Sequence, residues 1–204
     1  YTFNGSGTRE VDVGPIGAEL LGGHIQVPGN SITKLNYDGT IMGILSANGN
    51  YTHDGIDIYK YSTVSQSYSD LIGDFTIYNP HTFDLNKSGN RIVIGDVNAN
   101  SYGGVVKVYE YNSNASGSDP SWNQIGNDIS GSYPNNRVGY GISINNDGTR
   151  IAVGMHVYDS NKGKVDVYEL DSNNNWSSMG SSILGGVNDY GNGEEMGIDV
   201  KLNG

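Results

Sequence analysis

Hydrophobic and polar residues alternate along short stretches of this chain, with a period of two rather than the 3.6 of a helix. In residues 141–154, GISINNDGTRIAVG, Ile142 and Ile144 alternate with polar Ser143, and the alternation resumes after Asp147-Gly148. Glycine supplies the positive φ that a tight hairpin turn needs. The pattern therefore predicts a strand, a turn and a second strand.

Two further strands are expected in the same part of the chain. A loop rich in Asp, Asn and Gly leads to residues 164–170, where Val165 and Val167 alternate with more polar neighbours. A polar turn then precedes a fourth run that carries Trp176 and Met179. Four short antiparallel strands in roughly 50–60 residues are typical of one β-propeller blade. No segment has the pattern of an amphipathic helix.

The same features recur in the same order, which identifies a repeat protein. Turn glycines are spaced 50, 59 and 56 residues apart, at Gly39, Gly89, Gly148 and Gly204. A strand bearing a tyrosine follows each of the first three glycines and ends near Tyr59, Tyr109 and Tyr168. A tryptophan phrase occurs twice, at 122–126 and 176–180. The chain is thus expected to be all-β, a β-propeller built of four-stranded antiparallel blades.

The repeat divides the chain into about 3.5 blades. Residues 1–23 are expected to be the outer strands of a preceding blade, residues 24–77, 78–134 and 135–186 three whole blades, and residues 187–204 the inner strand of a following blade. The chain opens on YTF and stops on KLNG, so we expect a segment of a larger ring. A four-bladed ring closed by the first and last strands, and a solenoid-like stack, are the alternatives.

Three phrases resemble FG-GAP-like, or integrin-alpha-like, propeller repeats: GYGISINNDGTRIAVG (139–154), KVDVYE (164–169) and WSSMGSSILG (176–185). Residues 86–131 match nearly as well, and residues 31–73 match in part. The first blade departs from the pattern, because Tyr68-Ser69 stands where the others have tryptophan. The resemblance implies a display or adhesion scaffold, of the kind found in surface and secreted proteins of marine bacteria, algae and large algal viruses.

Composition narrows the function classes. The chain has 11 Lys and Arg against 22 Asp and Glu, a net charge of −11, so its surface repels nucleic-acid backbones. It contains no cysteine, which excludes disulfides, thiolate nucleophiles and zinc–cysteine sites. No apolar stretch reaches the length of a membrane span.

One loop is a candidate calcium site. Asp96, Asn98 and Asn100 alternate in a D-x-N-x-N pattern before Gly103, and calcium prefers several oxygen ligands with a glycine that turns the chain. The resemblance supports calcium in this loop. Against it, the late acidic ligand of a complete motif is missing, and the equivalent loop places Lys162 after Asp159. Asx residues also stabilise loops by bonding to the backbone.

The remaining candidates are modification and catalysis. Five N-x-[S/T] sequons fall in expected turns or loops, at Asn4, Asn50, Asn86, Asn114 and Asn175. About four would arise by chance in a chain this rich in Asn, Ser and Thr. For a glycoside hydrolase, no acid pair stands out, and Arg91 and Arg150 occupy equivalent repeat positions that mark them as structural.

These observations predict a non-enzymatic extracellular, cell-surface or virion structural or adhesion protein. Its propeller would present loops to protein partners or glycans, or assemble with copies of itself. A lectin-like module that uses loop tyrosines, with or without calcium, is the alternative, and a glycoside hydrolase is the third hypothesis.

Overall fold

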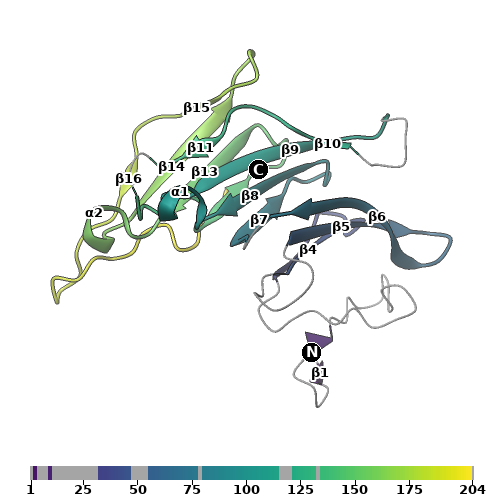
Figure 1. Cartoon of the computed structure of the whole chain (residues 1–204), viewed down its shortest axis with the longest axis horizontal. Coiled ribbons are helices and arrows are strands. Elements are labelled where there is room, and N and C mark those ends of the chain that lie inside the picture. Colours follow the sequence, from purple (N-terminus) through teal and green to yellow (C-terminus); the bar gives the residue numbers. More distant parts are fainter. Residues whose placement is uncertain are drawn as a thin grey trace. The chain divides into compact units, whose positions relative to one another are not determined.

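The computed structural model describes residues 2–3, 9–10, 32–46, 55–77, 80–114, 121–131 and 134–203. The fold is all-β, and three antiparallel sheets each contain a path of four consecutive strands (Figure 1). This confirms the predicted class, β-propeller blades of four antiparallel strands. The chain forms two compact units, residues 1–80 with 112–121, and residues 81–111 with 122–204.

The first unit contains the first sheet, in which four strands pair in chain order. They are β3 (Ile32–Leu35), β4 (Ile41–Ser46), β5 (Gly55–Ser62) and β6 (Ser67–Thr76). A separate pair, β1 (Thr2–Phe3) and β2 (Arg9–Glu10), forms a two-stranded sheet. Met42, Ile44 and Tyr68 form the buried cluster of the first sheet. The Tyr68 hydroxyl donates to the Gly39 carbonyl, so this tyrosine fastens the fourth strand to the first hairpin.

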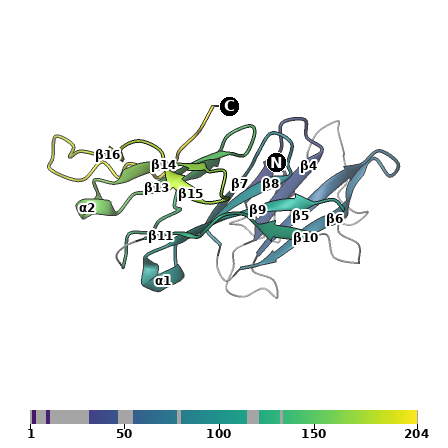
Figure 2. The ribbon, with the colours of Figure 1, turned by 90° about the horizontal axis from the view of Figure 1, so that it is seen from above.

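The second unit contains two sheets that share one plan (Figure 2). The second sheet is built from β7 (Thr82–Leu85), β8 (Arg91–Asp96), β9 (Val105–Asn112), β10 (Ser121–Gln124) and β11 (Ile129–Ser130). The third sheet is built from β12 (Ile142–Ile144), β13 (Arg150–Met155), β14 (Lys164–Leu170), β15 (Trp176–Ser178) and β16 (Ile183–Leu184). In both sheets, the fourth strand (β10 or β15) and the last short strand (β11 or β16) pair with the same third strand (β9 or β14). The helical turns α1 (Ala99–Tyr102) and α2 (Tyr158–Asn161) join the second and third strands.

An asparagine closes each inner hairpin, three residues before the turn glycine. The side-chain oxygens of Asn36, Asn86 and Asn145 accept the backbone N–H five residues later, at 2.9, 2.9 and 2.8 Å. The turn glycines have φ of +72°, +72° and +77° in the three sheets, as the predicted turns require. The predicted hairpins are therefore present, and their stability depends on asparagine as well as glycine.

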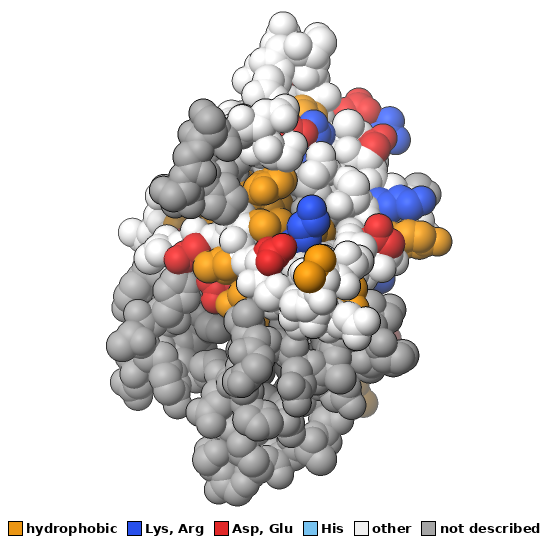
Figure 3. Space-filling view, turned by 90° about the vertical axis from the view of Figure 1, so that its right-hand side faces the viewer, with side chains coloured by type: hydrophobic (Ala, Val, Ile, Leu, Met, Phe, Trp, Pro, Cys, Tyr) orange, Lys and Arg blue, Asp and Glu red, His pale blue; other side chains and the backbone are white. Residues whose placement is uncertain are grey.

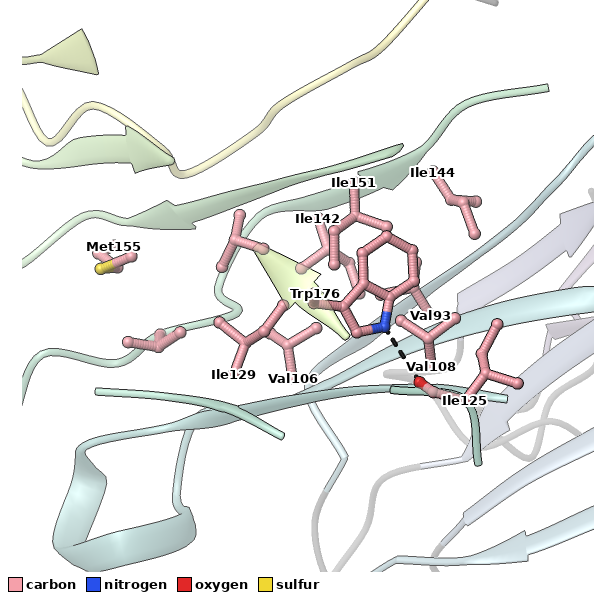
Figure 4. Packing of buried hydrophobic residues seen from close by; sticks show 12 residues of the cluster. Val93, Val106, Val108, Ile125, Ile129, Ile142, Ile144, Ile151, Met155 and Trp176 are labelled. Carbon is pink, nitrogen blue, oxygen red and sulfur yellow. Dashed lines mark hydrogen bonds between the residues drawn. The ribbon is translucent and has the colours of Figure 1, made fainter. Parts of the chain in front are cut away.

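The core of the second unit lies between its two sheets (Figure 4). Trp176 is buried there, and its indole N–H donates to the Ile125 carbonyl at 3.0 Å. A Cβ added to Gly126 would lie 2.7 Å from the indole nitrogen, so glycine is needed at that position. The other buried side chains of the cluster come from both sheets and include Val93, Val106, Val108, Ile129, Ile142, Ile151 and Val153.

The final segment follows a different register from the one predicted. The parallel bridge between Gly104 and Val138 is repeated by the bridge between Gly163 and Met196. The Leu202 N–H donates to the Ser143 side chain, just as the Ile144 N–H donates to the Asp84 side chain. These contacts make Asn203 equivalent to Asn145, and Gly204, the predicted fourth turn glycine, lies outside the described residues. The structure assigns no strand within residues 185–203, where a following inner strand was predicted. The domain boundaries themselves stay predictions, and residues 11–31 lie outside the described part.

Candidate functional site

In the second and third sheets, the second strand is joined to the third strand by a left-handed turn. Asn100, Ser101 and Tyr102 have φ of 53°, 57° and 65°. The equivalent residues Asp159, Ser160 and Asn161 have φ of 48°, 58° and 65°. Three consecutive residues of this kind are rare, because each costs about 1–2 kcal/mol relative to a right-handed conformation. The surrounding structure must therefore stabilise both turns.

Backbone hydrogen bonds from the next connecting segment hold each turn in place. In the first turn, the N–H groups of Arg137 and Val138 donate to the carbonyls of Tyr102 and Gly103, both at 3.0 Å. In the second turn, the N–H groups of Glu195 and Met196 donate to Asn161 and Lys162, at 2.7 and 3.0 Å. Each left-handed turn is thus the point at which the following chain segment is hydrogen-bonded to the sheet. We call this backbone contact a joint.

The side chains of these turns face solvent while their carbonyls are bonded. Asn100, Ser101 and Tyr102 are exposed, and the Arg137 guanidinium carbon lies 5.8 Å from the Tyr102 ring centroid. In the second turn, Lys162 forms a 2.8 Å ion pair with Asp159. We call residues 98–103, 137, 158–162 and 195 the loop face. It carries an aromatic ring, amides, hydroxyls and charges of both signs.

The structure separates the roles of the three predicted calcium ligands. One carboxylate oxygen of Asp96 accepts the N–H groups of Asn98 and Ala99, both at 3.0 Å, so Asp96 stabilises the start of the turn. Asn100 adopts the left-handed conformation and is exposed. Met155 ends β13 where Asp96 ends β8, yet the turn after Met155 has the same shape. The turn therefore forms without the carboxylate, and calcium binding at Asp96 stays a prediction.

Two histidines and a tyrosine form a stack beside the same joints. The Tyr140 ring centroid lies 4.1 Å from that of His81 and 3.9 Å from that of His156. Burial lowers the pKa of both histidines, with Arg137 contributing in the same direction. Nδ1 of His156 is buried and has no hydrogen-bond partner. Their spacing along the sequence gave no hint of this grouping, because each histidine comes from a different repeat position.

The predicted sequons differ in exposure. Asn114 and Asn175 are exposed, whereas Asn86 is only 2% exposed. The amide nitrogen of Asn86, the atom that a glycan would modify, donates to the Asn90 side chain at 2.9 Å. Burial therefore argues against a glycan at Asn86, because the side chain closes the hairpin. Asn4 and Asn50 lie outside the described residues.

The described residues contain no group of three or more His, Asp or Glu side chains placed to hold a metal ion. Within those residues, no helix is long and apolar enough to cross a membrane. The repeated tyrosines Tyr59, Tyr109 and Tyr168 lie in the third strand of each sheet and are half-buried. Figure 3 shows one face of the molecule on which acidic, basic and hydrophobic side chains lie close together.

No protein-family model matches the sequence, and no curated protein matches it. Among solved structures, a candidate 6-phosphogluconolactonase from Bacteroides uniformis has a TM-score of 0.49 and 13% identity, over 78% of this chain and 44% of its own. A second, from Bacteroides fragilis, has a TM-score of 0.47 and 16% identity, over 78% and 45%. The Cps50 (Swd1) β-propeller domain of Myceliophteria thermophila has a TM-score of 0.46 and 12% identity, over 76% and 42%. This chain thus spans less than half the length of each, and similarity at this level transfers no activity to it.

Proposed function

We propose that this chain is a non-catalytic display module of an extracellular, cell-surface or virion structural or adhesion protein. Its blades hold the loop face rigid so that partner proteins or glycans can bind there. The observation that supports the proposal is the repeated left-handed turn. Its backbone is bonded to the next segment, while its side chains are exposed.

The two turns show how such a scaffold could vary its surface. Their φ angles agree within 5°, yet one exposes Tyr102 where the other exposes Asn161. Because the bonds that fix the turn come from the backbone, the side chains are not needed for its shape. A binding surface of this kind can change its side chains without changing its backbone conformation.

An exchange of side chains tests the display function. The double variant Asn100→Asp/Tyr102→Asn gives the first turn the side chains of the second, since Ser101 and Ser160 already agree. We expect the melting temperature to shift by no more than about 4 °C, the change that roughly 1 kcal/mol produces at this size. Loss of the cooperative transition, followed by circular dichroism, would show that the side chains maintain the fold and would contradict the proposal.

Carbohydrate binding is the second candidate, and the exposed ring of Tyr102 favours it. Aromatic rings with neighbouring amides and hydroxyls suit sugar recognition. A glycan array probed with the chain, with and without calcium chloride, should show binding that Tyr102→Ala removes. Tyr37→Ala is the matched control, because Tyr37 is an exposed tyrosine of an inner hairpin in the first unit. An array without signal in either condition would count against this candidate.

The predicted calcium site has its own test. If Asp96, Asn98 and Asn100 bind calcium, the melting temperature should rise with calcium chloride, by the equivalent of about 2.7 kcal/mol at one hundred times the dissociation constant. Asp96→Asn should abolish the rise, and Asp159→Asn should leave it unchanged. An equal response in both variants would place the cation elsewhere.

Turnover of aryl glycosides by the wild-type chain would instead support a hydrolase.

A further inference from the structure

Side chains on the outer face of the third sheet are exposed, whereas the equivalent side chains of the second sheet are buried. Ile125 and Met179 are equivalent, because their N–H groups bond the Val108 and Val167 carbonyls at 2.9 and 2.7 Å. Ile125 is 8% exposed and Met179 is 44% exposed. Ile129 and Ile183 are also equivalent by strand register, with exposures of 5% and 55%.

The difference arises from what covers the second sheet. Trp176 of the third sheet packs on Gly126 and donates its indole N–H to Ile125, while its own backbone N–H bonds the Asn127 side chain at 2.7 Å. Gly180 is the counterpart of Gly126 and has nearly the same φ, +77° against +76°. A Cβ added to Gly180 would contact nothing within 4 Å. Gly180 therefore leaves open, on the third sheet, the place that the Trp176 indole occupies on the second sheet.

An arginine shows the same contrast. Arg91 pairs with Glu110 at 2.9 Å and also donates to the Gly148 carbonyl of the neighbouring hairpin at 3.0 Å, and its side chain is 18% exposed. Arg150 repeats the cross-strand pair with Glu169 at 2.8 Å, but its side chain is 48% exposed. The second bond of Arg91 requires a turn glycine from a following hairpin.

Some contacts of a junction between the third sheet and a following repeat are present in the structure. Met196 and Leu202 repeat the backbone contacts of Val138 and Ile144, so the leading segment of a further repeat lies on the third sheet in the same register. Continuity with the interface between the second and third sheets therefore identifies the occupant of the exposed face.

We infer that Arg150, Met179, Gly180 and Ile183 form a docking face for one further blade of the same repeat, with residues 187–203 as its leading segment. That blade carries a tryptophan equivalent to Trp176, which packs on Gly180 and donates to the Met179 carbonyl. It also carries a turn glycine, which accepts a hydrogen bond from Arg150. This interaction surface is independent of the loop face and of its proposed function.

An extended chain tests the inference. Because Asn203 is equivalent to Asn145, residues 146–203 can be repeated directly after Asn203 without breaking the register. We expect the rate of Met179 oxidation by hydrogen peroxide to fall at least tenfold in the extended chain, with buried Met155 as the internal reference. The same extension with its added tryptophan replaced by alanine should restore fast oxidation.

The Gly180→Ala variant provides a matched control. In the 204-residue chain it carries only the strain of a positive φ, whereas Gly126→Ala should also displace Trp176 and shift its fluorescence to longer wavelength. In the extended chain, Gly180→Ala should abolish the protection of Met179. Equal effects of Gly126→Ala and Gly180→Ala in the 204-residue chain would overturn the inference.

Three further results would also overturn it, two of them from the extended chain and one from the 204-residue chain. The first is fast oxidation of Met179 although hydrogen exchange shows the added blade to be folded. The second is an added blade that stays unfolded, since the same residues fold against the second sheet. The third is self-association of the 204-residue chain in sedimentation that Ile183→Asp abolishes, which would assign the face to a second copy.

Discussion

The indole nitrogen of Trp176 lies 3.0 Å from the carbonyl oxygen of Ile125, and this bond joins the fourth strand of the third sheet to the end of the fourth strand of the second. It satisfies a donor that would otherwise be buried without a partner in an apolar cluster. The bond fixes the distance between two neighbouring blades at their outer ends.

Replacing Trp176 should therefore destabilise the second unit strongly. Trp176→Ala is expected to cost about 3–5 kcal/mol, because it leaves a cavity and removes the bond. Trp122→Ala is the matched control, since Trp122 is only partly buried and should cost less. Urea unfolding followed by circular dichroism measures both variants. Equal losses would show that the junction does not depend on the buried indole.

The hairpin asparagines should differ in their contribution to stability. Asn86→Ala removes a buried side chain that both donates and accepts, so we expect a loss of about 1–3 kcal/mol. Asn145→Ala removes a more exposed bond to the Arg150 N–H and should cost about 1 kcal/mol. Denaturant titration of the two variants checks the order. A larger loss at Asn145 would contradict it.

Acid should weaken the second unit through the histidine stack. His81 and His156 each pack against Tyr140, with Arg137 and Glu195 as the neighbouring charged groups. Burial lowers the pKa of both histidines in the folded state, with Arg137 acting in the same direction, while Glu195 opposes this at His156. Because the unfolded chain then binds more protons, their contribution is complete above about pH 6.5 and is lost as pH falls through the folded pKa values.

Urea unfolding between pH 7.5 and 5 measures this loss. The double variant His81→Gln/His156→Gln should reduce the pH dependence in that range. A variant with the same slope as the wild type would assign the acid sensitivity to other groups.

Alkaline titration should distinguish the strand tyrosines. Burial, with Asp166 as the next cause, raises the pKa of Tyr168 to about 12. Burial, with Asp57 next, does the same for Tyr59. The folded state holds these protons more tightly, so the corresponding stability is present below pH 10 and is lost as pH rises toward 12. Absorbance at about 295 nm should show a late phase that Tyr168→Phe reduces; an unchanged late phase would refute the assignment.

The repeat could be predicted from the sequence because its strongest signals are local. Alternating residues such as Ile142 and Ile144, followed by a turn glycine, specify a hairpin without knowledge of the rest of the fold. The asparagine three residues before each glycine is also visible in the sequence, but its bond to the backbone follows from no local pattern. The register of Leu202 is not visible in such local signals, because it depends on a contact with Ser143 from the previous repeat.

The loop face could be predicted only in part. The oxygen-rich loop at Asp96 was identified, but its left-handed path was not, because no sequence pattern of Asn, Ser and Tyr specifies three positive φ angles in a row. The stack around Tyr140 was missed for a related reason. Its three rings come from segments that meet only when neighbouring sheets pack.

The backbone joint at the left-handed turns has a consequence for how such chains can diversify. Arg137 and Glu195 occupy the same place in two successive joints and make the same backbone bond, although their charges are opposite. A joint that depends on amides and carbonyls accepts either charge. Neighbouring blades can thus differ in charge at this position and keep the same backbone connection.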